Sequence, residues 1–291
     1  MTTGRPNRMV SVIIPIYNGQ RYIETTVRSV LNQTYGDYEI LCLIDGTNDD
    51  SAAIIERLNN GKIRQFYHAN QGATNTRNRG LKHAQGEYVV FLDQDDVLEP
   101  QFLEATIQEL ERTGATGVAV NGQLIDGEGR VIRRMYRINK PVLTYESLLK
   151  GNQLCTASQV LLKRKPLVEK IGAFDVNADQ ADDWDMWIRQ AQYGKLVFLD
   201  RSLMNYRLHD SNQSLNHGKM LRSELHIVEG KLNGARNHQA IKSYSYMRYS
   251  SKAADWKALS KALRLNASLV LLPRFYWTVC QVAWTRMWRN G

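Results

Sequence analysis

The chain has 291 residues, 43% hydrophobic and 23% charged, so it is long enough to bury a core and has an ordinary globular composition. Its three cysteines, Cys42, Cys155 and Cys280, lie far apart without metal-ligand spacing. This argues against a disulfide framework and for free thiols in a reducing compartment. Residues 1–200 carry 23 basic and 25 acidic side chains, whereas residues 201–291 carry 15 and 4. The basic C-terminal region therefore indicates an anionic partner, either membrane lipid or nucleic acid.

The first apolar run, Met9 to Ile16, follows basic residues and resembles the start of a signal peptide. It is short, contains Pro15 and lacks a small-residue cleavage site. We therefore predict that it is a first β-strand and that the protein is cytoplasmic.

Short β-rich runs alternate with helical patterns through the first half of the chain. Strands are predicted over 10–16, 39–44, 63–67 and 88–92, and helices over 20–33, 52–58, 74–84 and 101–112. Alternation of this length is typical of a parallel sheet that is covered by helices on both faces. We therefore predict an α/β fold with a central, mostly parallel sheet flanked by helices.

The middle of the chain changes character. Residues 117–126 and 131–136 are predicted to form a hairpin around the turn DGEG. A strand over 158–162, a helix over 166–171, a helix over 181–194 and strands over 196–199 and 203–208 are predicted to follow. From about residue 219 the chain is helical and basic. We therefore predict a main domain over residues 1–218 and a C-terminal helical extension over residues 219–291.

The last 25 residues are the most apolar part of the chain. Pro273 and Arg274 divide them into pieces that are shorter than the roughly 20 apolar residues a bilayer span needs. An interfacial amphipathic helix fits the tryptophans and arginines of this segment, which are Trp277, Trp284, Trp288, Arg274, Arg286 and Arg289. A helix packed on the main domain fits them equally well, and both interpretations remain open.

Polar residues follow every predicted strand of the first half. Ligands of parallel sheets bind in the crevice beyond the carboxyl ends of the strands. The residues found there are Tyr17 and Asn18, Asp45 and Gly46, Gln71 and Gly72, and Asp93 to Asp96. We therefore expect a binding site at this edge of the sheet.

Asp93, Asp95 and Asp96 form a carboxylate cluster after an apolar run. Carboxylates held this close repel one another, and burial protonates them unless a cation or hydrogen-bond donors compensate. The cluster has three interpretations: a solvated turn that caps the next helix, a divalent metal site for a phosphorylated substrate, or a nucleophilic Asp. The nucleophile hypothesis expects Thr or Ser where Val97 stands, so it is the least favoured.

Several motifs together resemble the family 2 glycosyltransferases with the GT-A fold. They are PIYNGQRYIETTVRSVLNQTYGDYEILCLIDGTNDDS, GATNTRNRGLKHAQGEYVVFLDQDDVLEP, IGAFD, DDWDMWIRQA and YRLHDSNQS, in this order between about residues 10 and 214. The resemblance implies a Rossmann-like GT-A catalytic domain and transfer of a sugar with inversion from a nucleotide-diphosphate sugar, linked to UDP or dTDP. It also implies a divalent metal, Mn²⁺ or Mg²⁺. From the basic tail we infer that the acceptor is a lipid-linked glycan or polysaccharide.

The resemblance also implies which residues surround the donor nucleotide. They are Pro15, Tyr17, Asn18, Asp45, Arg77, Asn78, Asp93 and Gln94. Ile44 stands where the family has the first Asp of D-D-G-S, which leaves contacts on that side of the base open. A solvated helix face is the alternative for Arg77.

Asp93 and Asp95 match the family's D-x-D, which touches the ribose and holds the metal under the diphosphate. His209 matches a histidine that reaches the metal or diphosphate in related enzymes, although a structural role is equally open. Asp96 is left undecided between supporting this site and capping the next helix.

Asp182, Asp183 and Asp185 match the family's E-D-W-D segment, whose second acid is the expected general base. A helix rotates by about 100° per residue, so the three carboxylates point in different directions. We predict that Asp183 is the base, with Asp182 as the second candidate.

Two other classes of protein remain open. The basic tail suggests nucleic-acid binding, but it lacks repeated or Gly-rich RNA-binding motifs, so nucleic acid is not the expected partner. The loss of the first Asp of D-D-G-S permits a catalytically impaired relative. We expect an enzyme that binds a nucleotide sugar and a glycan acceptor at the inner face of the cell membrane.

Overall fold

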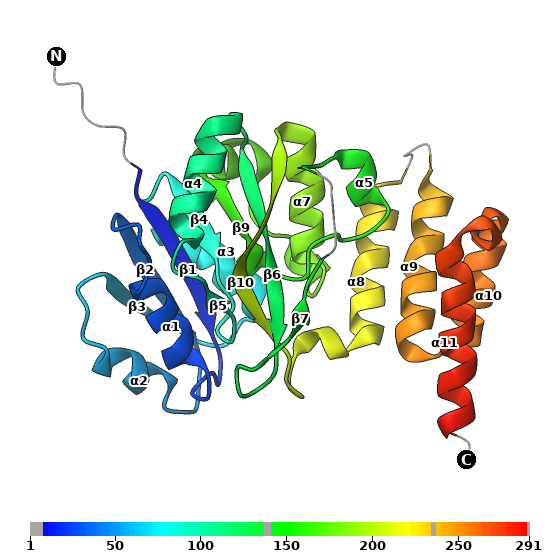
Figure 1. Ribbon diagram of the computed structural model, residues 1–291, viewed down its shortest axis with the longest axis horizontal. Coiled ribbons are helices and arrows are strands. Elements are labelled where there is room, and N and C mark those ends of the chain that lie inside the picture. The colour runs from blue at the N-terminus through cyan, green and yellow to red at the C-terminus, as the bar shows by residue number, and fades with distance from the viewer. Residues whose placement is uncertain (1–7, 137–140, 234–236, 290–291) are drawn as a thin grey trace. The chain divides into compact units, whose positions relative to one another are not determined.

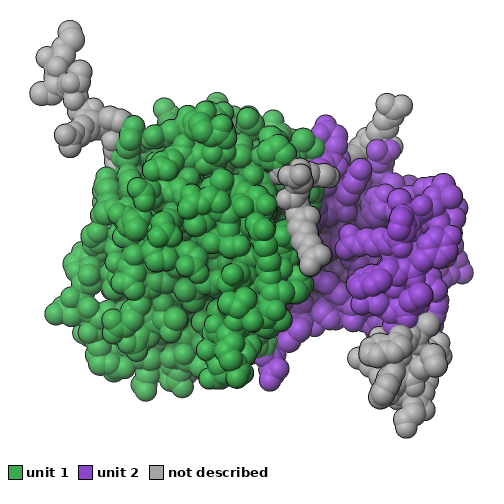
Figure 2. All heavy atoms as spheres, viewed as in Figure 1, with its two compact units in different colours: residues 1–145, 153–176, 186–209 green, residues 146–152, 177–185, 210–291 purple. Residues whose placement is uncertain are grey.

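The computed structural model describes residues 8–136, 141–233 and 237–289. The chain forms two compact units, which Figure 2 distinguishes by colour. The first consists of residues 1–145, 153–176 and 186–209, and the second of residues 146–152, 177–185 and 210–291. These units group residues by contact and not by function, so the predicted domain boundary at residue 218 stays a prediction.

A mixed sheet of ten strands forms the centre of the first unit within the described residues (Figure 1). Its parallel part has the order β3-β2-β1-β4. These strands are β1 (Val10–Ile16), β2 (Tyr38–Asp45), β3 (Ile63–His68) and β4 (Tyr88–Phe91). All four lie within one to two residues of the predicted strands, and the predicted α/β fold class is confirmed.

In the other part of the sheet, the pairing of the strands was not predicted. β9 (Val160–Lys163) lies between β4 and β6 (Gly117–Ile125) and is antiparallel to both. β10 (Leu196–Arg207) runs parallel to β6 as one strand with two register shifts, where two strands were expected. Short antiparallel strands complete the sheet, and these are β5 (Val97–Leu98), β7 (Val131–Arg134) and β8 (Val142–Leu143).

Helices cover both faces of the parallel strands. On one face, Val12 and Ile14 of β1 share a buried core with Val27 and Phe102, from α1 (Ile23–Leu31) and α4 (Phe102–Thr113). Ile55 of α2 (Ser51–Arg57) joins the same core. On the other face lies α3 (Ala73–His83), where a Cβ atom on Gly80 would meet the Ile13 side chain within 2.3 Å. Alternate residues of β1 therefore face opposite helix layers, as the period of a strand requires.

The remaining elements of the middle region are short, apart from one long helix. They are α5 (Tyr145–Leu149), η1 (Ala157–Gln159), α6 (Arg164–Pro166), η2 (Leu167–Ile171), η3 (Val176–Ala178), α7 (Asp182–Tyr193) and η4 (Gln213–Leu215).

The second unit is helical in its C-terminal part and has a core of its own. Tyr246, Met247, Leu259 and Phe275 are buried together there. Its elements are α8 (His217–Gly230), α9 (His238–Ala253), α10 (Trp256–Leu265), η5 (Ala267–Leu271) and α11 (Pro273–Arg289), labelled in Figure 1 except for η5. No helix in the described part of the chain is long and apolar enough to cross a membrane.

Candidate active site

Three carboxylates follow β4 directly. The strand and Leu92 are buried, and the chain then leaves the sheet through Asp93, Asp95 and Asp96. The side chains of Asp93 and Asp95 are 28% and 19% exposed, whereas Asp96 is completely buried. The cluster is therefore not a solvated turn, and each carboxylate needs a compensating partner.

Asp93 is compensated by a guanidinium group. Its Oδ1 lies 2.6 Å from Nη2 of Arg77, which comes from α3 and stacks over the Phe174 ring. Its Oδ2 accepts a hydrogen bond from Oγ1 of Thr156 at 3.0 Å. Arg77 has only 11% of its side chain exposed, so it does not lie on a solvated helix face.

Asp95 is paired with His209. Asp95 Oδ2 lies 2.8 Å from His209 Nε2, although 114 residues separate them in the sequence. Burial raises the pKa of Asp95, and the charge of Asp93 raises it further, while the bond to His209 opposes the shift. The structure therefore brings together two side chains that the resemblance assigned to one metal.

Asp96 is compensated by hydrogen-bond donors. Its Oδ2 accepts from Ser158 Oγ at 2.6 Å, and its Oδ1 accepts from the amide of Arg207 at 3.2 Å. Burial raises the pKa of Asp96 well above its ordinary value, and the charges of Asp95 and Asp93 act in the same direction. The following helix, α4, has Gln101 as its N-cap, so Asp96 does not cap it.

Thr156 and Ser158 support the cluster and were not predicted. Ser158 Oγ accepts from the amide of Asp93 at 3.0 Å. Thr156 Oγ1 lies 3.0 Å from a carboxylate oxygen of Asp93 and 3.1 Å from one of Asp96, so these share its single proton. The segment has a sequence signal, because Thr156 and Gln159 form a capping box around η1. That signal predicts a local turn but not its position beside β4.

Tyr17 and Gln94 form a reciprocal pair beside the carboxylates. The amide of Tyr17 donates to Gln94 Oε1 at 2.9 Å, and Gln94 Nε2 donates to the carbonyl of Tyr17 at 3.0 Å. The Tyr17 ring is 46% exposed. Pro15 is buried in β1, beyond the last residue that pairs with β4, so its missing N–H costs no bond to that strand.

Asn18 has a left-handed backbone with φ of 50°, which Asn tolerates better than most residues. The side-chain Oδ1 of Asn18 accepts a hydrogen bond from the backbone N–H of Asn48 at 3.0 Å. The backbone N–H of Asn18 donates to Thr47 Oγ1 at 2.9 Å. Asn18 therefore joins the loop after β1 to the loop after β2.

The side chains of Asp45 and Asn78 form hydrogen bonds within the protein. Asp45 is 2% exposed, and its carboxylate accepts from the amides of Gln71 and Gly72 at 2.7 and 2.9 Å. Asn78 exchanges two hydrogen bonds with the backbone of Phe174, at 2.9 and 2.8 Å. Both residues hold loops at the edge of the sheet.

The acidic start of α7 belongs to the second unit. Asp182 and Asp185 are 4% and 1% exposed, and Asp185 forms an ion pair with Lys231 at 2.7 Å. Asp183 is only partly buried. Its Oδ2 accepts from Asn152 Nδ2 at 3.0 Å, and its Oδ1 from the amide of Trp184 at 2.7 Å. Of the three carboxylates, Asp183 is thus the most accessible.

Two neighbouring side chains of the first unit have the chemistry of ligands for a divalent metal. No group of three or more His, Cys, Asp or Glu side chains is arranged as a metal site in the part of the chain described. Asp95 and His209 form a pair of possible ligands, with Asp93 next to them. Mg²⁺ is commonly held by one or two carboxylates, substrate phosphates and water, and Mn²⁺ also suits carboxylate ligands. The pair is consistent with such a partly protein-bound ion.

Comparison with known sequences agrees with the predicted family. The sequence model of "Glycosyl transferase family 2" matches residues 11–169. An uncharacterized glycosyltransferase of Nostoc sp. is 32% identical over 221 residues, which cover 71% of this chain and 67% of the relative. The chondroitin synthase of Pasteurella multocida is 28% identical over 241 residues, 82% of this chain but 24% of the synthase. The chain also covers only 35% of an uncharacterized Rickettsia conorii glycosyltransferase.

Solved structures share the fold. S. aureus TarS in complex with UDP superposes with a TM-score of 0.64 and 19% identity, over 94% of this chain and 88% of that chain. Mannosyltransferase PcManGT from Pyrobaculum calidifontis, in complex with GDP-Man and Mn²⁺, has a TM-score of 0.60 and 18% identity, over 99% and 89%. The likeness supports the predicted GT-A fold. With the family match over more than half of its length, the chain belongs to glycosyl transferase family 2, a family of transferase enzymes.

Proposed function

We propose that the protein is an inverting glycosyltransferase that uses a UDP- or dTDP-linked sugar and a divalent metal. The pairing of Asp95 with His209 beside Asp93 is the observation that carries this proposal, because it joins two distant family motifs at one sheet edge. Proteins of the same fold support it, since TarS binds UDP-GlcNAc and PcManGT binds GDP-Man and Mn²⁺. The acceptor is a hydroxyl group of a lipid-linked glycan or polysaccharide.

The residues of the first unit hold the donor. Asp95 and His209 are assigned to the metal, and Asp93 to the ribose or the metal. Arg77 and Thr156 hold the Asp93 carboxylate in place for this role. When bound, the metal neutralises the negative charge that grows on the departing diphosphate. The exposed ring of Tyr17 is assigned to the nucleotide base. Asp45 and Asn78 position the loops around it.

Asp183 is assigned to the acceptor side as the general base. It removes the proton of the acceptor hydroxyl while that oxygen attacks the anomeric carbon and the bond to the diphosphate oxygen breaks. This single displacement inverts the anomeric configuration. The burial of Asp182 and the Lys231 partner of Asp185 favour Asp183 for this role, and Asp182 remains the second candidate.

The segment around η5 and the start of α11 is proposed to contact an anionic membrane surface. Leu271, Tyr276 and Trp277 are 79%, 61% and 56% exposed there. Residues 201–291 also carry a net charge of +11. Exposed apolar and aromatic groups on a basic region fit binding at a lipid interface. Trp284, Trp288, Arg286 and Arg289, also predicted to contribute, have side chains outside the described part of the structure.

A panel of nucleotide sugars tests the donor and metal assignments. UDP-, dTDP- and GDP-linked sugars should be compared for binding and hydrolysis with and without Mn²⁺ or Mg²⁺. We expect metal-dependent turnover with a UDP or dTDP sugar and a loss of about 100-fold or more in Asp95→Asn, because loss of a residue that only supports a metal ligand already costs about 10- to 100-fold. Asp200→Asn, at an exposed ion pair with Arg134, is the matched control. Unchanged metal dependence in Asp95→Asn contradicts the assignment.

Asp183→Asn tests the general base separately from donor binding. The turnover number should fall by about 10²- to 10⁴-fold, the usual contribution of a positioned base. UDP affinity measured by calorimetry should not change, because the substitution keeps the size of the side chain. Asp182→Asn is the comparison variant. If it abolishes turnover and Asp183→Asn does not, the base is Asp182.

The buried Asp96 predicts a pH dependence of stability. Its pKa is raised above 3.8 in the folded protein, so the folded chain keeps this proton to higher pH than the unfolded chain. The free energy of unfolding should therefore fall as the pH rises from about 4 through the folded pKa. Asp96→Asn should flatten this decline in urea unfolding with a chelator present. Equal slopes in the two proteins contradict the prediction, and Asp200→Asn again serves as control.

Vesicle sedimentation tests the membrane contact. The double variant Leu271→Ser, Trp277→Ser should bind anionic phosphatidylglycerol vesicles more weakly than the unaltered chain, because it removes exposed apolar area. Tyr67→Ser replaces a side chain that is 65% exposed on β3 in the first unit, and it should bind normally. Equal binding of all three proteins argues for a helix that packs within the protein.

A further inference from the structure

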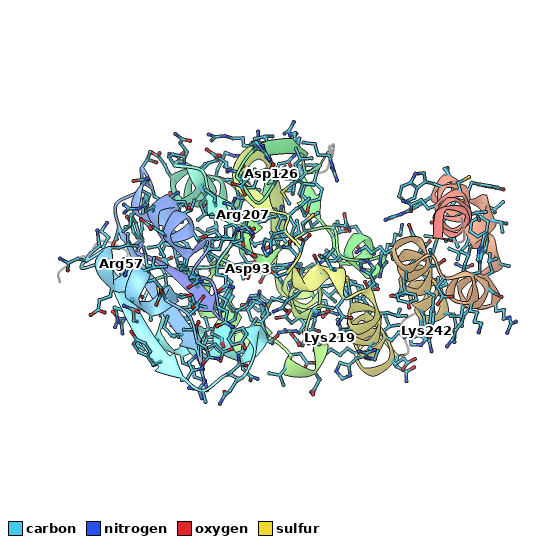
Figure 3. The ribbon with its side chains drawn as sticks, turned by 90° about the horizontal axis from the view of Figure 1, so that it is seen from below. Arg57, Asp93, Asp126, Arg207, Lys219 and Lys242 are labelled. Carbon is cyan, nitrogen blue, oxygen red and sulfur yellow. The ribbon has the colours of Figure 1, made fainter. Side chains whose placement is uncertain are left out.

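Arg207 lies at the last position of β10, two residues before His209, and is only 4% exposed. We propose that Arg207 is a positioning residue that couples the β6–β7 turn, residues 126–129, to the Asp95–His209 pair. The proposal rests on the function proposed above, because it assigns Arg207 a task at the metal ligands. Figure 3 labels Arg207 together with Asp93 and Asp126.

The Arg207 guanidinium joins two loops through main-chain carbonyls. Its Nε donates to the carbonyl of Asp95 at 2.9 Å, and its Nη1 lies 3.2 and 3.4 Å from the carbonyls of Asp126 and Gly127. The Arg207 amide also donates to the Asp96 carboxylate at 3.2 Å. One planar group therefore fixes the backbone of a proposed metal ligand relative to the turn.

Tyr22 packs between the same groups. Its ring centroid lies 4.7 Å from the Arg207 guanidinium, 5.0 Å from that of Arg21 and 5.0 Å from the His209 ring. Its buried hydroxyl has no hydrogen-bond partner in the described residues and would lie 3.3 Å from a Cβ atom added to Gly127. Tyr22 thus packs against the His209 imidazole with its ring and lies close to the turn at its hydroxyl end, so a shift of the turn would also displace the imidazole.

The turn is accessible from outside. Arg21 forms an ion pair with Glu128 at 3.2 Å, with both side chains about two-thirds exposed, and all four residues of β7 are exposed. A ligand that displaces this hairpin would move the carbonyls that hold Arg207. The position of the Asp95–His209 pair would change with them.

Arg207→Lys tests the coupling, because lysine keeps the charge but lacks the planar fork that reaches both loops. Mn²⁺ affinity, measured by calorimetry in the presence of saturating UDP, should fall by about 10- to 100-fold, as for other residues that orient metal ligands. Arg130→Lys is the matched control, since Arg130 binds the same turn through the Asp126 side chain but is 78% exposed. It should bind Mn²⁺ normally.

Gly127→Ala provides a second test that leaves Arg207 in place. The added methyl group approaches Tyr22 and Arg21 at 3.3 Å and should shift the turn, which should weaken Mn²⁺ binding in the same direction by a smaller factor. Gly36→Ala, where nothing lies within 4 Å, is its control. Normal Mn²⁺ binding in both Arg207→Lys and Gly127→Ala overturns the coupling alone. Failure of the unaltered protein to bind Mn²⁺ in the presence of UDP would overturn the metal assignment and the coupling with it.

Discussion

Electrostatic repulsion among Asp93, Asp95 and Asp96 is the constraint on which the first unit depends. The three carboxylates stand within four residues after a buried strand, and each is compensated in a different way. A guanidinium from α3 pairs with the first, an imidazole after β10 with the second, and hydroxyl and amide groups with the third. The partner of Asp93 lies only 16 residues before it, whereas the partners of Asp95 and Asp96 come from distant parts of the sequence. The antiparallel insertion of β9 and the addition of β10 to β6 bring them to the edge where β4 ends.

This compensation divides the cluster into two parts with different chemistry. Asp96 is enclosed, and its carboxylate serves the structure by holding Ser158 and the backbone of Arg207. Asp93 and Asp95 keep some exposure, so a ligand could reach them. The same separation occurs at α7, where Asp182 and Asp185 are buried and Asp183 is partly accessible. In both segments, only one or two of the three carboxylates are exposed enough for a substrate to reach.

The elements of the first half follow from local patterns, since short apolar runs and helical spacing identify strands such as β1 and helices such as α4 almost to the residue. The family resemblance identified the Asp95–His209 pair across 114 residues, which no local pattern links. The antiparallel placement of β9 was missed because strand pairing depends on long-range packing. Thr156, Ser158 and Arg207 were missed because they act through hydroxyl groups and main-chain carbonyls, which many residue types can contact. The directions of the Asp45 and Asn78 side chains also could not be read from their positions in a motif.

The order of the strands has a consequence for synthesis of the chain. β1 to β4 emerge first from the ribosome, and with them the whole acidic cluster, whereas β9, β6 and β10 must all be in place before His209 meets Asp95. A nascent chain that ends before residue 209 therefore carries the carboxylates without their imidazole partner and without the Arg207 link to the turn. Because domains generally fold as units, the edge of the sheet that is synthesised first becomes chemically complete only when the later strands are present.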